Sequence, residues 1–269
     1  MKTQISIIGC GWLGLPLAKT CIEEGFSING STTSKDKLED LKAFQIKPFL
    51  ITLNSSGISS NYSEFLTGSE TVIINIPPGL RRNPTKNHVA EIKHLMLAIE
   101  KHAIKNVLYI SSTSVFEDHS DFPIITSKTL PNGTSSIAKQ LIEIEQMLQA
   151  NSNFNTTILR FGGLIDENRH PANFLAGRDN VSNPNAPINL IHKTDCISII
   201  VTILKKQLWN VSINAAYPRH TSKKDYYSNC CKQKNLPLPS FNNSQESKGK
   251  IIDSSILVQL LNYRFKVKP

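Results

Sequence analysis

The chain has 269 residues, of which 39% are hydrophobic and 19% are charged, and its formal net charge is +9. This length and apolar content exclude an intrinsically disordered chain and suffice for one large α/β domain, alone or with a small lobe. No apolar run reaches the about 18 residues that a transmembrane helix needs, so we predict no membrane-spanning segment.

The distribution of basic residues and cysteines narrows the function classes further. The basic residues occur as scattered pairs, and no stripe interleaves them with aromatic side chains, so we predict no nucleic-acid-binding surface. The positive charge would attract small anionic ligands, but a merely solvated basic face is the preferred interpretation. The five cysteines form no C-x-x-C or Cys/His spacing. This favours a reducing compartment, with the cytoplasm as the expected location, and no metal site.

Strands and helices alternate along the first 161 residues. β-Branched segments ended by turn residues predict strands at 4–9, 26–31, 48–53, 71–76, 106–111 and 156–161. Helical periodicity predicts helices at 13–25, 34–42, 86–103 and 134–150, with Ser34 as the cap of the second. This order predicts an α/β fold of the Rossmann type, a doubly wound parallel sheet with helices on both faces.

Beyond residue 162 the pattern becomes less regular. A long loop rich in Gly, Pro and Asn precedes a strand at 188–192, a helix at 194–206 capped by Thr194, and a strand at 211–216. A short helix and a last helix near 254–262 follow. We therefore predict a Rossmann core at 1–162, a substrate-lobe loop at 163–187, a return to the core at 188–216, and a small C-terminal substrate lobe at 217–269.

A glycine-rich sequence, "GCGWLG", lies between the first strand and the first helix. Gly9, Gly11 and Gly14 have the G-x-G-x-x-G spacing that allows a tight turn, close backbone approach to a diphosphate, and close helix packing. The N-terminus of the following helix presents free N–H groups to the phosphates. We predict that this loop, including Trp12 and Leu13, binds a dinucleotide.

The end of the second strand indicates which dinucleotide is preferred. An NAD-binding chain usually has an acidic residue there, which holds the ribose 2′-hydroxyl. This chain instead has Ser31, Thr32, Thr33 and Lys35, with no acid before Asp36. Hydroxyls and a cation suit a 2′-phosphate, so we predict NADP, with NAD as the alternative. The end of the fourth strand, Asn75, Ile76 and Pro77, is expected to lie along the ribose and diphosphate.

Several further segments carry a family resemblance. "YISSTSVFED" at 109–118, "LRFGGLI" at 159–165, "RHP" at 169–171, "NLIHKTDC" at 189–196, "INAAYP" at 213–218 and "SKGKIID" at 247–253 accompany the glycine loop. Together they resemble the extended short-chain dehydrogenases of the nucleotide-sugar epimerase and dehydratase group, in particular its YeeZ-like atypical members. The resemblance implies oxidoreductase or epimerase-like chemistry on a nucleotide-linked or otherwise anionic substrate. It also leaves open a homodimer through the helices at 86–103 and 134–150.

The resemblance also implies roles for individual residues. Ser112 takes the position of the family's catalytic serine or threonine, and Lys139 that of the lysine that holds the nicotinamide ribose. Ser135 stands where the family has its catalytic tyrosine. Ser111 and Gly162 are implied as further cofactor contacts. Arg169 and His170 are implied as substrate contacts.

The missing tyrosine has a chemical consequence. A tyrosine of pKa about 10 exchanges protons far more readily than serine, and general acid–base catalysis contributes roughly 10²–10⁴-fold to a rate. His170, His192 and Tyr109 are substitutes by residue type, and His170 is the preferred one. Tyr109 is expected in the strand core, and His192 is expected to orient a loop beside Asp195. The alternative function is a catalytically silent dinucleotide-binding sensor or scaffold.

Overall fold

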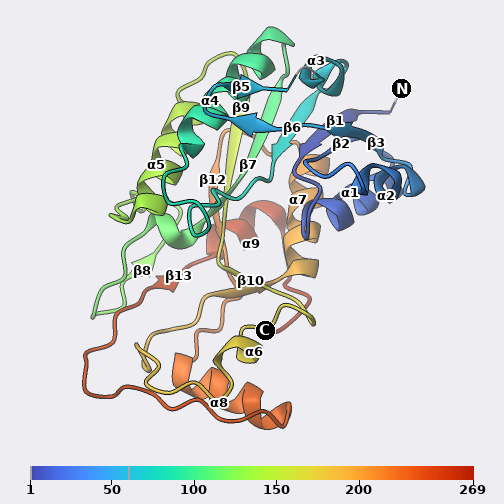
Figure 1. The fold of residues 1–269 in the computed structure, drawn as a ribbon. Helices are drawn as coiled ribbons and strands as arrows, with labels where there is room; N and C mark the ends of the chain where they lie inside the picture. Colours follow the sequence, from blue (N-terminus) through green and yellow to red (C-terminus); the bar gives the residue numbers. More distant parts are fainter. Residues whose placement is uncertain (1, 60) are drawn as a thin grey trace.

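A seven-stranded parallel sheet forms the centre of the molecule (Figure 1). The computed structural model describes residues 2–59 and 61–269. The strand order is β12-β9-β7-β6-β1-β2-β3. The bounds are β1 Gln4–Ile8, β2 Ser27–Thr32, β3 Lys47–Leu50, β6 Thr71–Ile74, β7 Asn106–Ser112, β9 Asn155–Phe161 and β12 Ser212–Ala215. The predicted Rossmann-type fold is confirmed.

Helices cover both faces of this sheet, which explains why most residues of its strands are buried, whichever face their side chains lie on. One face packs against α1 (Gly14–Glu23), α2 (Lys37–Ala43), α7 (Lys193–Lys206) and α9 (Ser255–Leu261). The other packs against α3 (Tyr62–Leu66), α4 (His88–Lys101) and α5 (Ser136–Gln149). The two faces bury separate apolar clusters, so the sheet lies between two helical layers.

The strand order reverses beside β1. This strand pairs with β2 on one side and with β6 on the other, and all of these pairs are parallel. The carboxyl ends of the strands therefore meet at one edge of the sheet. At such a reversal the connections diverge and leave a crevice, which is where ligands bind in open α/β sheets.

A smaller body lies beyond this edge of the sheet (Figure 1). It contains the parallel pair β10 (Gly163–Ile165) and β11 (Leu190–His192), together with α6 (Ala172–Leu175) and α8 (Lys223–Gln233). These elements share an apolar cluster of their own, in which Tyr226, Tyr227 and Cys231 are buried. The short parallel pair of β8 (Ile124–Ile125) and β13 (Ile251–Ile252) connects this lobe to the core.

The last helix differs from expectation. The sequence predicts a lobe that continues to residue 269, but α9 packs against α7 and β12 of the core. Leu257 and Leu261 are buried in the same apolar cluster as α7, and Tyr263 follows them. The apolar face of α9 is thus satisfied by the sheet, so the lobe comprises residues that precede this helix.

Several element ends also differ from the predictions. Helix α2 begins after Asp36, and Ser34 lies in the turn before it, where its N–H donates to Thr32 Oγ1 at 3.2 Å. Helix α7 begins after His192, whose Nδ1 accepts from Thr194 N–H at 3.2 Å. The predictions of Ser34 and Thr194 as caps were therefore wrong. The predicted third strand ends at residue 50, and a hairpin of β4 (Leu53–Asn54) and β5 (Gly57–Ile58) follows.

Candidate cofactor and substrate site

The glycine-rich loop leaves β1 at the carboxyl edge of the sheet. Gly9 has a φ of +103°, and a Cβ there would lie 2.5 Å from the carbonyl oxygen of Asn75. A Cβ on Gly14 would lie 2.1 Å from the carbonyl oxygen of Gly9. Only Gly11 faces free space, since a Cβ there would meet no protein atom within 4 Å. The protein's own packing requires the outer two glycines, whereas the middle one lines a cradle that fits the diphosphate of a dinucleotide.

Two side chains hold the backbone of this loop at Gly9. The Ser31 hydroxyl accepts a hydrogen bond from Gly9 N–H at 3.0 Å, and Asn75 Nδ2 donates to the Gly9 carbonyl at 3.0 Å. Ser31 is buried, so it supports the loop and does not face the crevice, contrary to its expected contact with a 2′-phosphate. Ile76 is half-buried and Pro77 is exposed directly after Asn75.

The end of β2 presents an exposed basic turn. Thr33 and Lys35 are exposed, whereas Thr32 is buried. In the part of the chain that the structure describes, Lys35 takes part in no ion pair. Its charge is therefore free to meet an anion beside the glycine-rich loop.

A second hollow lies at the carboxyl ends of β7 and β9. It is a cavity of about 350 Å³ shared by the core and the lobe. Ser112 ends β7 at its wall, and its hydroxyl accepts from Ser114 N–H at 3.1 Å, which starts the short helix η1 (Thr113–Val115). The polar side chains of the wall are Ser112, Thr113, Ser114, Asp118, Asn183, Asn189, Lys223, Lys248 and Lys250. Three ammonium groups against one carboxylate give the wall of this cavity an excess of positive charge.

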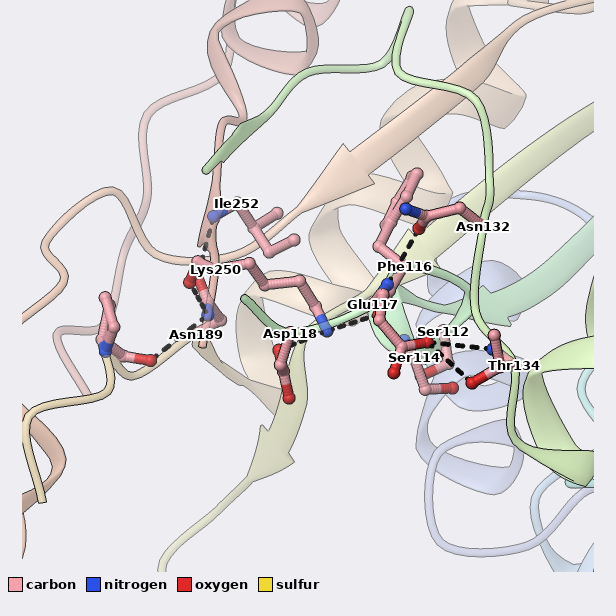
Figure 2. Close-up of polar contacts among 11 residues, drawn as sticks. Ser112, Ser114, Phe116, Glu117, Asp118, Asn132, Thr134, Asn189, Lys250 and Ile252 are labelled. Carbon is pink, nitrogen blue, oxygen red and sulfur yellow. Dashed lines mark hydrogen bonds and ion pairs between the residues drawn. The ribbon is translucent and has the colours of Figure 1, made fainter. Parts of the chain in front are cut away.

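Lys250 is the most rigidly held of these cations (Figure 2). Only 9% of the residue is exposed, and its Nζ donates to the Phe116 carbonyl at 2.7 Å and to Asp118 Oδ1 at 2.8 Å. The side-chain amide of Asn189 holds the backbone on both sides: its Nδ2 donates to the Lys250 carbonyl at 2.8 Å and its Oδ1 accepts from Ile252 N–H at 2.9 Å. Asn189 and Lys250 both belong to segments quoted for the resemblance, yet the sequence assigned no role to either.

Comparison with known proteins assigns the chain to a family. A family model described as NAD(P)H-binding matches residues 9–206, from the first glycine of the loop to the end of α7. The chain belongs to the NAD(P)H-binding family. Protein YeeZ of Escherichia coli strain K12 is 27% identical over 265 residues, which cover 98% of this chain and 96% of that protein.

Solved structures with the same fold extend the comparison of this NAD(P)H-binding chain. UDP-N-acetylglucosamine 4-epimerase from Bacillus cereus is similar at a TM-score of 0.79 and 15% identity, over 99% of this chain and 92% of that one. A short-chain dehydrogenase/reductase superfamily protein from Agrobacterium tumefaciens, with bound NAD, is similar at a TM-score of 0.77 and 13% identity. That match covers 98% of this chain and 93% of the other. At these identities the likeness shows a shared fold.

Helix α5 does not bring Lys139 to the cavity of this family member. Leu141, Ile144 and Leu148 face the sheet, and Lys139 stands two residues before the first of them, about 200° around the helix. Lys139 is accordingly exposed and is absent from the cavity wall. Ser135 caps the helix, its hydroxyl accepting from Ala138 N–H at 3.1 Å. The roles that the resemblance implies for Lys139, toward the nicotinamide ribose, and for Ser135 stay predictions.

Ser111 and Gly162 also serve packing. The Ser111 hydroxyl donates to Glu145 Oε1 at 2.5 Å, inside the layer between β7 and α5. A Cβ on Gly162 would lie 2.4 Å from the Asn189 carbonyl, so this glycine allows the lobe to approach the core. Gly162 nevertheless lies in the cavity wall with Ser112, whereas the side chain of Ser111 does not.

The three histidine and tyrosine substitutes lie outside the cavity wall. His170 Nε2 is 3.0 Å from the Tyr226 hydroxyl within the lobe, where burial and nearby Lys234 lower its pKa. His192 caps α7, and its Nε2 lies 3.3 Å from a carboxylate oxygen of Glu167. Tyr109 is fully buried beneath α5, and burial raises its pKa.

The loop that follows Ser112 is fixed to the start of α5 (Figure 2). Glu117 accepts from the backbone N–H of Thr134 at 3.0 Å and from its hydroxyl at 3.1 Å, and these bonds hold the pKa of Glu117 below its usual value. Asn132 Oδ1 accepts from Glu117 N–H at 2.9 Å. These bonds position the segment between Ser112 and Asp118 along the cavity.

Residues 2–59 and 61–269 hold neither a candidate membrane-spanning helix nor a candidate metal-ligand cluster. None of their helices is both long and apolar enough to cross a membrane. They contain no group of three or more His, Cys, Asp or Glu side chains suited to hold a metal ion.

Proposed function

We propose that this chain is an oxidoreductase or epimerase-like enzyme, with NADP preferred over NAD, that acts on a nucleotide-linked or otherwise anionic substrate without the usual catalytic tyrosine. One observation carries this proposal. Ser112 lies in the wall of a cavity lined by three lysines, at the same sheet edge as a glycine cradle open at Gly11.

The charge of the cavity supports an anionic substrate. Lys250 is paired with Asp118, so Lys223 and Lys248 supply the excess positive charge. Burial lowers the pKa of Lys223, whose Nζ donates to the Ser182 carbonyl at 2.9 Å. A diphosphate-linked sugar would offer two negative groups to these lysines. The UDP-N-acetylglucosamine 4-epimerase that shares this fold is named for a substrate of this kind.

The division of chemistry follows from the residues at hand. A nicotinamide cofactor, when bound, supplies or accepts a hydride. In this proposal Ser112, in the wall of the cavity, holds a substrate oxygen by a hydrogen bond. Among the described residues, the groups of the cavity wall that ionise are Asp118 and the three lysines, and no tyrosine or histidine is present there. Proton transfer would therefore involve one of these groups or water.

The preference for NADP rests on the turn after β2. Thr33 and Lys35 are exposed there, and the first acidic residue, Asp36, is the N-cap of α2. A free ammonium beside the ribose favours a 2′-phosphate by charge attraction. Ser31 and Thr32 are buried, so Thr33 and Lys35 are the residues that would meet the 2′-phosphate.

Turnover with a substrate panel tests the proposal. Purified protein is mixed with UDP-linked and dTDP-linked sugars in the presence of either the oxidised dinucleotide, which accepts a hydride from a sugar hydroxyl, or NADPH, which donates one to a carbonyl. The absorbance of the reduced nicotinamide and the chromatographic profile of the sugars are followed. We expect turnover of at least one compound, and a rate about 100-fold lower in Ser112→Ala. Ser120→Ala, an exposed serine outside the cavity wall, is the matched control.

Two results would contradict this expectation. Dinucleotide binding without any turnover would favour the sensor or scaffold instead. An unaltered rate in Ser112→Ala would remove the serine from the mechanism.

Pairing of two copies through α4 and α5, which lie side by side, stays a prediction that the mass of the protein in solution would check.

A further inference from the structure

Trp12 of the glycine-rich loop is flanked by two cations that come from distant parts of the chain. The Arg169 guanidinium carbon lies 4.9 Å from the centre of the indole, and so does Lys193 Nζ. Both distances are within the about 6 Å at which a cation is attracted to an aromatic ring. Arg169 belongs to the turn after β10, and Lys193 begins α7. The turn after β10 therefore lies against the loop that would hold the cofactor.

Asp166 fixes this turn and uses one of the two cations. Its carboxylate is buried, and Oδ1 accepts from the backbone N–H groups of Asn168 and Arg169 at 3.0 and 2.6 Å. Oδ2 forms an ion pair with Lys193 Nζ. The charge of Lys193 is thus compensated, and the backbone of Arg169 is held in place.

The guanidinium of Arg169 has no such partner. Within residues 2–59 and 61–269 it forms no ion pair and no hydrogen bond, and it contacts the ring of Trp12. The residue is exposed and is absent from the wall of the lysine-lined cavity. It was expected to contact the substrate, but its neighbour is the cofactor loop.

The loop beneath it offers unused donors. Leu13, the N-cap of α1, provides no side-chain cap. The described structure gives no backbone acceptor to the N–H groups of Gly11 and Trp12, and Gly11 faces free space. Backbone donors at the start of a helix attract phosphate, and an uncompensated arginine beside them adds to that attraction.

We infer that Arg169 binds the diphosphate of the dinucleotide and is not a substrate contact. This rests on the cofactor part of the proposed function. Asp166 and Trp12 are positioning residues, since they hold the turn and the side chain beside the cradle. The substrate lobe thereby contributes a cation to the cofactor site of the core.

Trp12 itself provides the measurement. The chain has two tryptophans, so Trp209→Phe leaves Trp12 as the only indole and its fluorescence reports on this loop. In that background, NADP, NADPH and ADP-ribose are titrated into the parent protein and into Arg169→Ala. Losing one charge-assisted contact should weaken the binding of all three by about 10- to 100-fold. Arg169→Lys should recover part of this loss.

The controls separate the diphosphate from the rest of the ligand. Arg178→Ala removes another exposed arginine of the lobe and should leave all affinities unchanged. Adenosine 2′-monophosphate has no diphosphate, so its affinity should not respond to Arg169→Ala. Thermal unfolding of each variant checks the fold.

Two outcomes would overturn the inference in different ways. If the parent binds NADP(H) and Arg169→Ala binds it equally well, the role of Arg169 fails while the proposed function stands. If the parent binds no dinucleotide at all, the proposed function fails together with this role.

Discussion

In the proposed preference for NADP, Lys35 is the residue that would meet the 2′-phosphate. Its ammonium is exposed after β2 and compensated by no carboxylate in the described part of the chain, whereas Ser31 is occupied with Gly9. A single unpaired charge at this point would attract a 2′-phosphate, and a charge of opposite sign would repel it.

Lys35→Glu should therefore reverse the preference. We expect NADP affinity to fall about 10- to 100-fold, because one charge-assisted contact is lost, while NAD affinity stays the same or rises. Calorimetric titration with both dinucleotides measures the effect, and Lys37→Glu on the same exposed segment is the control. Tighter binding of NAD than NADP by the unmodified protein would contradict the premise.

Some residues of the site were predictable from the sequence and others were not. The spacing of Gly9, Gly11 and Gly14 was sufficient to predict the loop, because each position has a separate geometric demand. Lys250 and Asn189 could not be assigned from spacing, since their contacts join residues more than 60 positions apart. Their importance depends on tertiary neighbours that a linear pattern does not contain.

At the scale of elements, a buried ion pair fastens α5 to the sheet. Arg160 of β9 bonds Glu145 of α5 through Nε at 3.1 Å and Nη2 at 2.7 Å, and Ser111 of β7 donates to the same carboxylate. Both charged side chains are almost fully buried. The position of α5, and with it the segment that Glu117 holds at its start, depends on this contact.

Arg160→Met should destabilise the fold by about 3–5 kcal/mol, because Glu145 would be buried without its cation. Replacing both residues, with Glu145→Leu added, should recover a large part of the loss. Urea unfolding measures both variants. The exposed pair Glu39–Lys42 is the control, and Lys42→Met should cost less than about 1 kcal/mol. Equal losses of unfolding free energy in Arg160→Met and Lys42→Met would contradict this expectation.

The elements themselves were largely predictable. The strands at 71–76 and 106–111 are continuous apolar segments, and they became β6 and β7 because both sheet faces are covered. The helix of 134–150 was predicted with the apolar stripe that it has. Because that stripe faces the sheet, Lys139 lies on the exposed side of the helix. The helical spacing of the apolar residues was enough to predict this exposure.

At the scale of the whole molecule, the C-terminal tail is tied to α7 by one buried carboxylate. Asp195 accepts from the Tyr263 hydroxyl at 2.7 Å and from the backbone N–H groups of Lys266 and Val267 at 2.7 and 3.1 Å. No sequence pattern indicated this contact, because it joins positions about 70 residues apart. This contact holds the residues that follow α9 against the start of α7.

Asp195→Ala should lower the free energy of unfolding by about 3 kcal/mol or more, since three hydrogen bonds to a buried charge are lost. Tyr263→Phe removes one of them and should cost roughly 1–2 kcal/mol. Chemical denaturation followed by circular dichroism compares the two variants. An unchanged midpoint for Asp195→Ala would show that the tail adds nothing to stability.

The order in which the chain visits core and lobe has a practical consequence. The lobe elements β10, β11 and α6 come before α7 and β12, and α8 comes after them. The wall of the cavity accordingly draws on residues 112–118, 162–189 and 223–250. A chimera that moves the lobe side of this cavity onto a related protein must therefore exchange the segments 162–189 and 223–250 together. Exchange of the C-terminal segment alone would transfer only part of the cavity wall.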